Sequence, residues 1–315
     1  MDRPVCSGSD FRHGQIHSSS SLVALYRSKE WDEKNRLHHR TLAQTAQILL
    51  GLLNRWFPAR KSTAIGDTGF GTSRVARFCS KKRNLQLVSK FYRDAALHEA
   101  APVLEKKANG RPRKKGCRLP TPEETVEKTK KRKRLIVSWY GGGNRSIEVV
   151  SGKGFWHKTG QKLVEVSWVV VHDLTGAHRD EYSYTTNMSM PQHEIIETYT
   201  MRWSIEITFQ ESREYLRLES PKCHAKSTVL RTTPCLFGLY TIVVLLYLKL
   251  LAKAKGQTAV SWAGKSTITF SDMIIAVRRE IWSQWVFKSS SGINTLSKLP
   301  AKVRRDVLRA VLEAA

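Results

Sequence analysis

The segment Tyr199–Arg213 constrains the fold most, because it predicts a helix with one charged and one apolar face. It contains neither glycine nor proline, and Pro191 precedes it at a position that favours a helix start. Four side chains fall close to one face at steps of three, four and seven residues: Tyr199, Arg202, Glu206 and Arg213. Three apolar side chains form a stripe beside them: Ile205, Phe209 and Leu216.

This pattern places Glu206 at the border between a buried stripe and a polar face. An acid flanked by cations on a packed helix stays ionised at neutral pH. Such an acid can bind a divalent metal ion, and the neighbouring cations Arg202 and Arg213 can hold phosphates. An ordinary amphipathic helix with surface ion pairs explains the same spacing, so the segment alone leaves both interpretations open.

The charge of the chain indicates the kind of partner. Its 53 Lys and Arg residues against 27 Asp and Glu residues give a formal net charge of +26 over 315 residues. That excess is larger than solubility requires and favours a polyanionic partner, with nucleic acid as the first choice. Attachment to a ribosome or to a membrane surface is the competing interpretation.

Cysteine usage and hydropathy indicate the compartment. The five cysteines are scattered, odd in number and contain no Cys-x-x-Cys pair, which argues against a disulfide framework and favours the cytoplasm. The apolar run Cys235–Leu251 is short for a membrane span and contains Thr241 and Lys249, so we expect a buried helix and no membrane association.

A second acid, Asp67, follows a short β-type run, Ser62–Ile65, and precedes a glycine-rich turn and a helix over Ser73–Lys82. An acid at the carboxyl end of a buried strand is where α/β folds place their chemistry. A structural Asp that caps the turn is the alternative. The same region predicts strands over Leu22–Tyr26 and Asn84–Phe91 and a helix from Thr41 to about Trp56.

From Pro102 to Arg134 the chain is basic and poor in apolar residues, which predicts an exposed basic loop or a solvated linker. Its candidate DNA-binding residues are Arg111, Arg113, Lys114, Lys115, Lys131, Arg132, Lys133 and Arg134. Period-two segments then predict a small antiparallel sheet, interrupted by turns such as Ser151–Gly154: they are Arg134–Tyr140, Arg145–Val150, Lys162–His172 and Arg179–Thr186. Helices are expected towards the carboxyl end, over Thr232–Lys255, Ser271–Phe287 and Lys298–Ala315.

The two acids, with a β-rich segment between them, resemble bacterial insertion-sequence transposases of the DDE type that carry a β insertion. The signature of that group is Tyr-x2-Arg-x3-Glu-x6-Lys, matched here by Tyr199, Arg202 and Glu206, with Arg213 in place of the Lys. The stretch Gly66–Gly71 resembles the segment that carries the second catalytic Asp. The resemblance extends over roughly residues 22–315.

The resemblance implies an α/β fold with an RNase H-like catalytic core, incomplete at its N-terminus, interrupted by a mostly antiparallel β insertion and followed by a helical C-terminal region. The corresponding parts are an irregular segment 1–21, a partial core 22–100, a basic and β-rich insertion 101–190, a helical part of the core 191–257 and a C-terminal helical region 258–315. The group's first Asp has no counterpart in an apolar run upstream of Leu22, so we expect an N-terminally truncated member.

The same resemblance implies Mg²⁺ or Mn²⁺ as cofactor, with Asp67 and Glu206 as catalytic metal ligands, and Tyr199, Arg202 and Arg213 at the DNA. The expected partners are double-stranded DNA at terminal inverted repeats, target DNA and a second copy in a homodimer, in the cytoplasm and at the nucleoid. Two functions remain open at this point: cleavage and strand transfer by a two-metal mechanism, or DNA binding without catalysis that inhibits a full-length enzyme.

Overall fold

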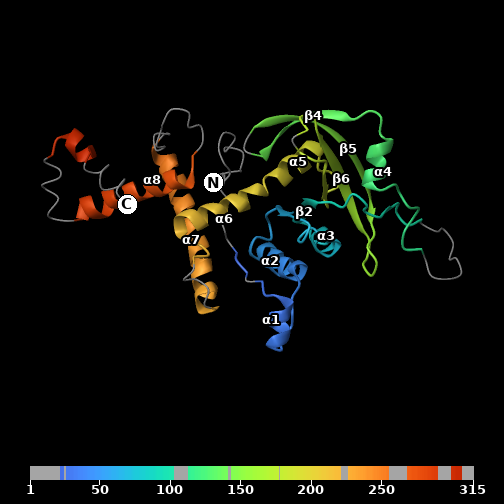
Figure 1. Cartoon of the computed structure of the whole chain (residues 1–315), viewed down its shortest axis with the longest axis horizontal. Helices are drawn as coiled ribbons and strands as arrows, with labels where there is room; N and C mark the ends of the chain where they lie inside the picture. The colour runs from blue at the N-terminus through green and yellow to red at the C-terminus, as the bar shows by residue number, and fades with distance from the viewer. Residues whose placement is uncertain are drawn as a thin grey trace. The chain divides into compact units, whose positions relative to one another are not determined.

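The computed structural model describes residues 22–24, 26–102, 113–140, 143–176, 178–220, 226–254, 268–289 and 299–306 (Figure 1). The chain divides into two compact units. We call Ala24–Trp203 the sheet unit, and Ser204–Ala315 together with Met1–Val23 the helical unit. The candidate DNA-binding residue Arg111, and residues 307–315 of the helix predicted over Lys298–Ala315, lie outside the described part of the chain.

In the part of the sheet unit that the structure describes, seven strands form one mixed, mostly antiparallel sheet in the order β1-β2-β7-β6-β5-β3, with β4 also paired to β5. The strands are β1 (Ser62–Gly66), β2 (Leu85–Lys90), β3 (Leu97–His98), β4 (Lys133–Ser138), β5 (Asn144–Trp156), β6 (Val164–Asp173) and β7 (Glu181–Thr185). β1 and β2 are parallel, and the other paired strands are antiparallel. The β-rich segment predicted as an insertion therefore continues the sheet of β1 and β2 instead of forming a sheet of its own.

Helices cover both faces of this sheet, because successive side chains of a strand point to opposite sides. Leu87 packs with α2 (Leu42–Trp56) and α3 (Ser73–Ser80) on one face. The next residue, Val88, packs with α5 (Gln192–Thr200) on the other face. This layering confirms the predicted α/β class.

The helix expected from Thr41 is present because its first turn carries a complete capping box. The Thr41 hydroxyl accepts a hydrogen bond from the Gln44 backbone N–H, and the Gln44 side chain accepts one from the Thr41 N–H at 2.8 Å.

β5 is longer than the sequence predicts, and the expected turn at Ser151–Gly154 is wrong. Gly152 pairs with Trp168 of β6, and a Cβ added at Gly152 would lie 2.6 Å from the Trp168 ring. The glycine therefore lets the indole lie against the backbone of a continuous strand.

Two further predictions in the sheet unit are wrong. Leu22–Tyr26 forms no strand at its described residues, where Val23 and Tyr26 are exposed. The expected basic loop contains a helix, α4 (Pro122–Lys128), whose Thr121 and Glu124 form a capping box.

Another short helix, α1 (Lys29–Lys34), begins after the cap Ser28 in a stretch that has no apolar periodicity.

The helical unit contains most of α6 (Trp203–Leu216), α7 (Lys226–Ala254) and α8 (Phe270–Ser289), and residues 301–306 are also helical. One face of α7 packs with α8 through Tyr240, Tyr247 and Phe270. The other face exposes Leu239, Ile242 and Leu245, so the prediction of a buried helix holds for one side only. By length and composition alone, Ser227–Leu251 could span a membrane, and 28% of its most apolar window is buried.

Candidate active site

Asp67 immediately follows β1, and a tight turn fixes its backbone. The Asp67 carbonyl accepts hydrogen bonds from the N–H groups of Phe70 at 2.9 Å and Gly71 at 2.6 Å. Across the turn, the Ser89 hydroxyl of β2 donates to the Gly66 carbonyl at 2.9 Å. The strand end is therefore held from both sides while the Asp67 side chain remains exposed to solvent.

Gly71 is the residue that makes this turn possible. A Cβ at this position would lie 1.8 Å from the Ser89 hydroxyl oxygen and 2.7 Å from the Ser89 Cβ. The Gly71 carbonyl also accepts a 2.8 Å hydrogen bond from the buried Tyr184 hydroxyl. The glycine is required for the close approach of the turn to β2, and Asp67 is positioned as a consequence.

The environment of Asp67 keeps its carboxylate ionised. Burial alone would raise the pKa of Asp67, but hydrogen bonds from the Thr68 N–H and hydroxyl, together with the charges of Arg202 and Lys90, lower it. The Thr68 N–H donates to Asp67 Oδ1 at 2.6 Å and the hydroxyl at 3.2 Å. Asp67 is thus an exposed anion with cations nearby, which suits a metal ligand.

Arg202, just after the end of α5, lies close enough to Asp67 for its charge to lower the Asp67 pKa, although the two residues are remote in sequence. Its guanidinium lies 5.9 Å from the ring centroid of Tyr199, which is only 6% exposed. Burial raises the pKa of Tyr199 despite the opposing charge of Arg202, so its hydroxyl stays protonated. The Tyr199 ring is therefore placed to orient the Arg202 guanidinium, and little of the ring is exposed for contact with DNA.

Lys90, and Glu181 as the partner of Tyr140, lie near this cluster and were not identified from the sequence. Lys90 ends β2, and the parallel register that pairs Gly66 with Ser89 brings it beside Asp67. Tyr140 donates a 3.3 Å hydrogen bond to the Glu181 carboxylate. Burial raises the pKa of Tyr140 most, and the negative charge of Glu181 raises it further. Lys90 could have been found by asking which residues end a strand next to β1, whereas the Tyr140–Glu181 pair carries no local signal.

The helix predicted over Tyr199–Arg213 is interrupted. α5 ends at Thr200, and α6 begins at Trp203. Between them the Arg202 N–H donates to the Tyr199 carbonyl at 3.1 Å, an i to i−3 bond that tightens the last turn. The predicted apolar stripe is also incomplete, because Ile205 is 50% exposed.

Glu206 lies in the first turn of α6 and is partly exposed. It belongs to the helical unit and Asp67 to the sheet unit. The joint metal site of these two acids therefore stays a prediction. Among the described residues, no cluster of three or more His, Cys, Asp or Glu side chains is arranged to hold a metal ion.

Further along α6, Arg213 forms an ion pair with Glu219. Its Nε lies 2.6 Å from Glu219 Oε2 and its Nη2 3.3 Å from Oε1. The hydrogen bond to Glu219 raises the pKa of Arg213, and both side chains are at least half exposed. Because this pair is exposed, a phosphate could compete with Glu219 for the guanidinium.

A buried acid that the sequence did not identify, Glu211, anchors the helical unit. Its carboxylate accepts a 2.6 Å hydrogen bond from the Tyr240 hydroxyl and a 3.2 Å bond from the Phe270 N–H. Glu211 therefore joins α6 to both α7 and α8 and has a structural role.

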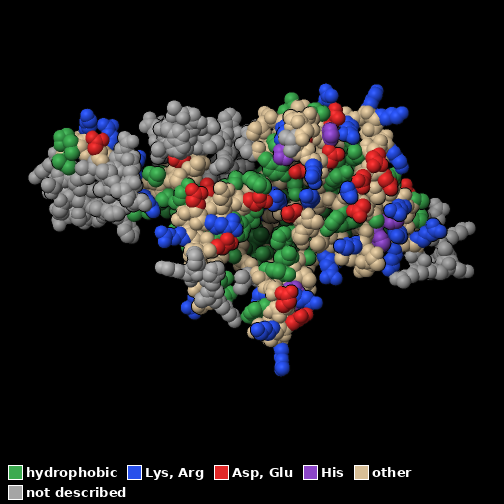
Figure 2. Space-filling model, viewed as in Figure 1, with side chains coloured by type: hydrophobic (Ala, Val, Ile, Leu, Met, Phe, Trp, Pro, Cys, Tyr) green, Lys and Arg blue, Asp and Glu red, His purple; other side chains and the backbone are tan. Residues whose placement is uncertain are grey.

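The basic candidate residues fall into two groups. Arg113, Lys114 and Lys115 are exposed beside the end of β5 and the turn that follows it. The second group begins before β4 and continues into it: Lys131, Arg132, Lys133 and Arg134. Arg134 pairs with Glu148 at 3.1 Å, which offsets its charge. On the face shown in Figure 2, Lys and Arg side chains are spread over the sheet unit among acids instead of forming one stripe.

These observations define a mixed α/β protein whose exposed, ionised Asp67 lies at a strand end beside Arg202 and Lys90. A family model described as the transposase DDE domain matches residues 27–231, about two thirds of the chain. The chain therefore belongs to the family of transposase DDE domains, and its function is in transposition. Members of this family generally use divalent metal ions and act on DNA. A search of the curated proteins found no match.

Proposed function

We propose that this protein cleaves DNA at the ends of an insertion sequence and joins them to target DNA by a two-metal mechanism. The observation that carries the proposal is Asp67, an exposed carboxylate kept ionised at a strand end beside Arg202 and Lys90. In this proposal β1, β2, α2 and α3 belong to an RNase H-like core, β4–β7 to its insertion, and Glu206 supplies a second carboxylate.

The donor set fits the proposed ions, since carboxylate oxygens are the ligands that Mg²⁺ and Mn²⁺ prefer. Asp67 and Glu206 would hold the metal. When bound, a metal pair lowers the pKa of the nucleophilic water or 3′-hydroxyl and stabilises the leaving oxygen. Arg202 and Lys90 would hold non-bridging phosphate oxygens near Asp67, and Tyr199 would keep the Arg202 guanidinium in place.

The test is Mg²⁺-dependent nicking and strand transfer on a duplex that carries the matched insertion-sequence end. We expect Asp67→Asn and Glu206→Gln each to lower the rate by roughly 10²-fold or more, because each removes charge stabilisation in the transition state. Glu33→Gln, an exposed acid on α1, is the matched control and should cleave normally. Equal rates in all three variants would exclude Asp67 and Glu206 as catalytic residues.

Metal binding gives a second readout that does not depend on turnover. Electron paramagnetic resonance of Mn²⁺ should show weaker binding to Asp67→Asn and to Glu206→Gln than to the Glu33→Gln control, since each catalytic substitution removes one anionic ligand. Loss of binding in only one of the two variants would show that these acids do not share a site.

A second candidate function is DNA binding without cleavage, with inhibition of a full-length enzyme by mixed assembly. The net charge of +26 favours it. This function predicts steeply salt-dependent binding and no nicking at any metal concentration. In either case we propose a homodimer that acts on nucleoid DNA in the cytoplasm.

A further inference from the structure

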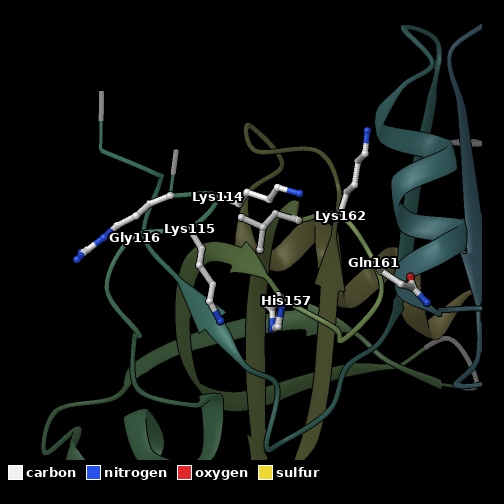
Figure 3. Close-up of a pocket in the computed structure, with 8 residues that line it drawn as sticks. Lys114, Lys115, Gly116, His157, Gln161 and Lys162 are labelled. Carbon is white, nitrogen blue, oxygen red and sulfur yellow. The ribbon is translucent and has the colours of Figure 1, made fainter. Parts of the chain in front are cut away.

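The sheet unit has a pocket of about 520 Å³, away from Asp67, whose lining includes four cationic residues (Figure 3). Its polar lining comes from two segments, 113–116 and the turn between β5 and β6. The side chains that carry the argument are Arg113, Lys114, Lys115, His157, Gln161 and Lys162. Figure 3 shows Lys115 pointing toward His157, whereas Gln161 turns away from the lysines.

Backbone hydrogen bonds fix the 113–116 side of the pocket. The Gly116 N–H donates to the Glu99 carbonyl at 3.1 Å, and the Glu99 N–H donates to the Cys117 carbonyl at 2.9 Å. A Cβ at Gly116 would lie 2.3 Å from the Ala100 carbonyl oxygen, so the glycine allows this close approach. Lys114 and Lys115 therefore project from an anchored segment.

The opposite side is held by Ala96, which precedes β3, and by α3. The His157 N–H donates to the Ala96 carbonyl at 2.9 Å. The Ser73 hydroxyl of α3 donates to the Gln161 side chain, and Arg77 Nη1 donates to the Leu163 carbonyl at 3.3 Å. The turn that carries His157 and Lys162 is thus attached to a core helix.

The charge of this pocket is unbalanced. Four cationic side chains line it, and none of its eight lining residues is Asp or Glu; the acid Glu99 adjoins the lining residue Gly116. Burial, followed by the charges of Lys115 and His98, lowers the pKa of His157, so its imidazole is neutral at pH 7. Elsewhere on the visible face of this unit, cations and acids are interspersed (Figure 2). A concave site whose lining carries four cations and no carboxylate attracts an anionic ligand.

The register of the sheet shows that this pocket is separate from Asp67. Asp67 follows Gly66, which pairs with Ser89, so along the strands Asp67 lies level with Lys90 of β2. Lys90 pairs with Ser183 of β7, and Ser183 pairs with Val169 of β6. The pocket adjoins Val164, at the start of β6. From β1 to β6 there are three strand spacings of about 4.8 Å each, and from Val169 to Val164 there are five residues of about 3.3 Å each. Combined at right angles, these distances give a separation of roughly 20 Å between Asp67 and the pocket.

We propose that this pocket binds a phosphate group of the nucleic-acid backbone, distinct from the phosphate at Asp67. The proposal rests on the proposed function for the identity of the polyanion. Lys114, Lys115 and Lys162 supply the ammonium groups, and His157 reports on occupancy. The contact positions the duplex and carries no sequence information, since it involves the backbone alone.

The test combines salt dependence with a probe inside the pocket, using the full chain. The pocket variant is Lys114→Gln with Lys115→Gln and Lys162→Gln. The matched control replaces three exposed lysines elsewhere in the same unit: Lys34→Gln, Lys61→Gln and Lys81→Gln. For the pocket variant, the slope of log affinity for end duplex against log salt should become shallower by roughly 0.9 for each phosphate that the protein no longer neutralises. The slope of the control should change less.

A pH titration of the His157 imidazole signals by nuclear magnetic resonance distinguishes the two sources of phosphate, which are the DNA duplex and inorganic phosphate. Bound anion should raise the His157 pKa, with duplex and also with inorganic phosphate alone, and the pocket variant should lose this response. A response to inorganic phosphate without any response to duplex would overturn the nucleic-acid assignment. No response to either, or equal slopes in both variants, would overturn the site itself. If the pocket responds but the protein never nicks DNA, the cleavage proposal fails and the pocket stands.

Discussion

Replacing Gly71 by alanine should disturb the turn that positions Asp67. The new Cβ would lie 1.8 Å from the Ser89 hydroxyl oxygen and 2.7 Å from its Cβ, and it would approach the Asp67 carbonyl at 3.2 Å. Rotation of Ser89 relieves only the first contact, because its Cβ is fixed to the backbone of β2. Either the turn or the strand must therefore move.

The expected loss of stability follows from these contacts. An extra methyl group in a packed site costs about 1–3 kcal/mol. Displacement of Ser89 also breaks its 2.9 Å hydrogen bond to the Gly66 carbonyl, which adds about 1 kcal/mol. The total of about 2–4 kcal/mol corresponds to amide exchange roughly 30- to 1,000-fold faster, at tenfold per 1.4 kcal/mol. We expect this acceleration in β1 and β2, together with slower nicking.

Hydrogen–deuterium exchange read by mass spectrometry on peptides that cover β1 and β2 measures this effect locally. Gly69→Ala is the control in the same turn, because its Cβ would meet only Leu42 Cδ1 at 3.6 Å; we expect a change within about 0.5 kcal/mol. Gly71→Ala added to a Ser89→Gly background should cost less than about 1 kcal/mol, since both close contacts are gone. The same penalty in both backgrounds, or a penalty for Gly69→Ala equal to that for Gly71→Ala, would refute the steric argument.

Three further outcomes are expected. Arg202→Gln should raise the pKa of Asp67, whose ionised form Arg202 favours, so the acid limb of the pH–nicking profile should move to higher pH; an unmoved limb would contradict this. Glu211→Ala should lower the free energy of unfolding by about 3 kcal/mol, measured by circular dichroism in urea, because it removes an acceptor of the buried Tyr240 hydroxyl. Burial raises the pKa of the Cys79 thiol to about 12, so iodoacetamide at pH 8 should alkylate it far more slowly in folded than in urea-unfolded protein.

Local signals were sufficient for much of the secondary structure. The capping residue Thr41 and the apolar spacing that follows it predicted α2, and the alternation of Lys162–His172 predicted β6. Asp67 was correctly expected at a strand end because β-type residues, an acid and glycines follow one another there. These features depend on residues that are neighbours in the sequence, so the residues of each segment are sufficient to predict them.

Other features depend on partners that are distant in sequence. Gly152 permits a continuous strand because Trp168 covers it, and without that partner a glycine-rich stretch predicts a turn. The break between α5 and α6 contains no glycine or proline that would mark it. It follows Tyr199, which is buried in the core between α5 and the sheet. Periodicity could not show either outcome, because tertiary packing overrides local propensity.

The sequence alone determined the chemistry that this protein can offer: a large positive charge, an acid at a strand end, and a Tyr-Arg-Glu spacing on a helical segment. Only the tertiary structure brought Arg202 and Lys90 near Asp67, and only it brought Lys114, Lys115, Lys162 and His157 to the lining of one pocket. The physical reason is that electrostatic effects depend on distance through space, and the pairing of β1 with β2 and the docking of α5 on the sheet set those distances.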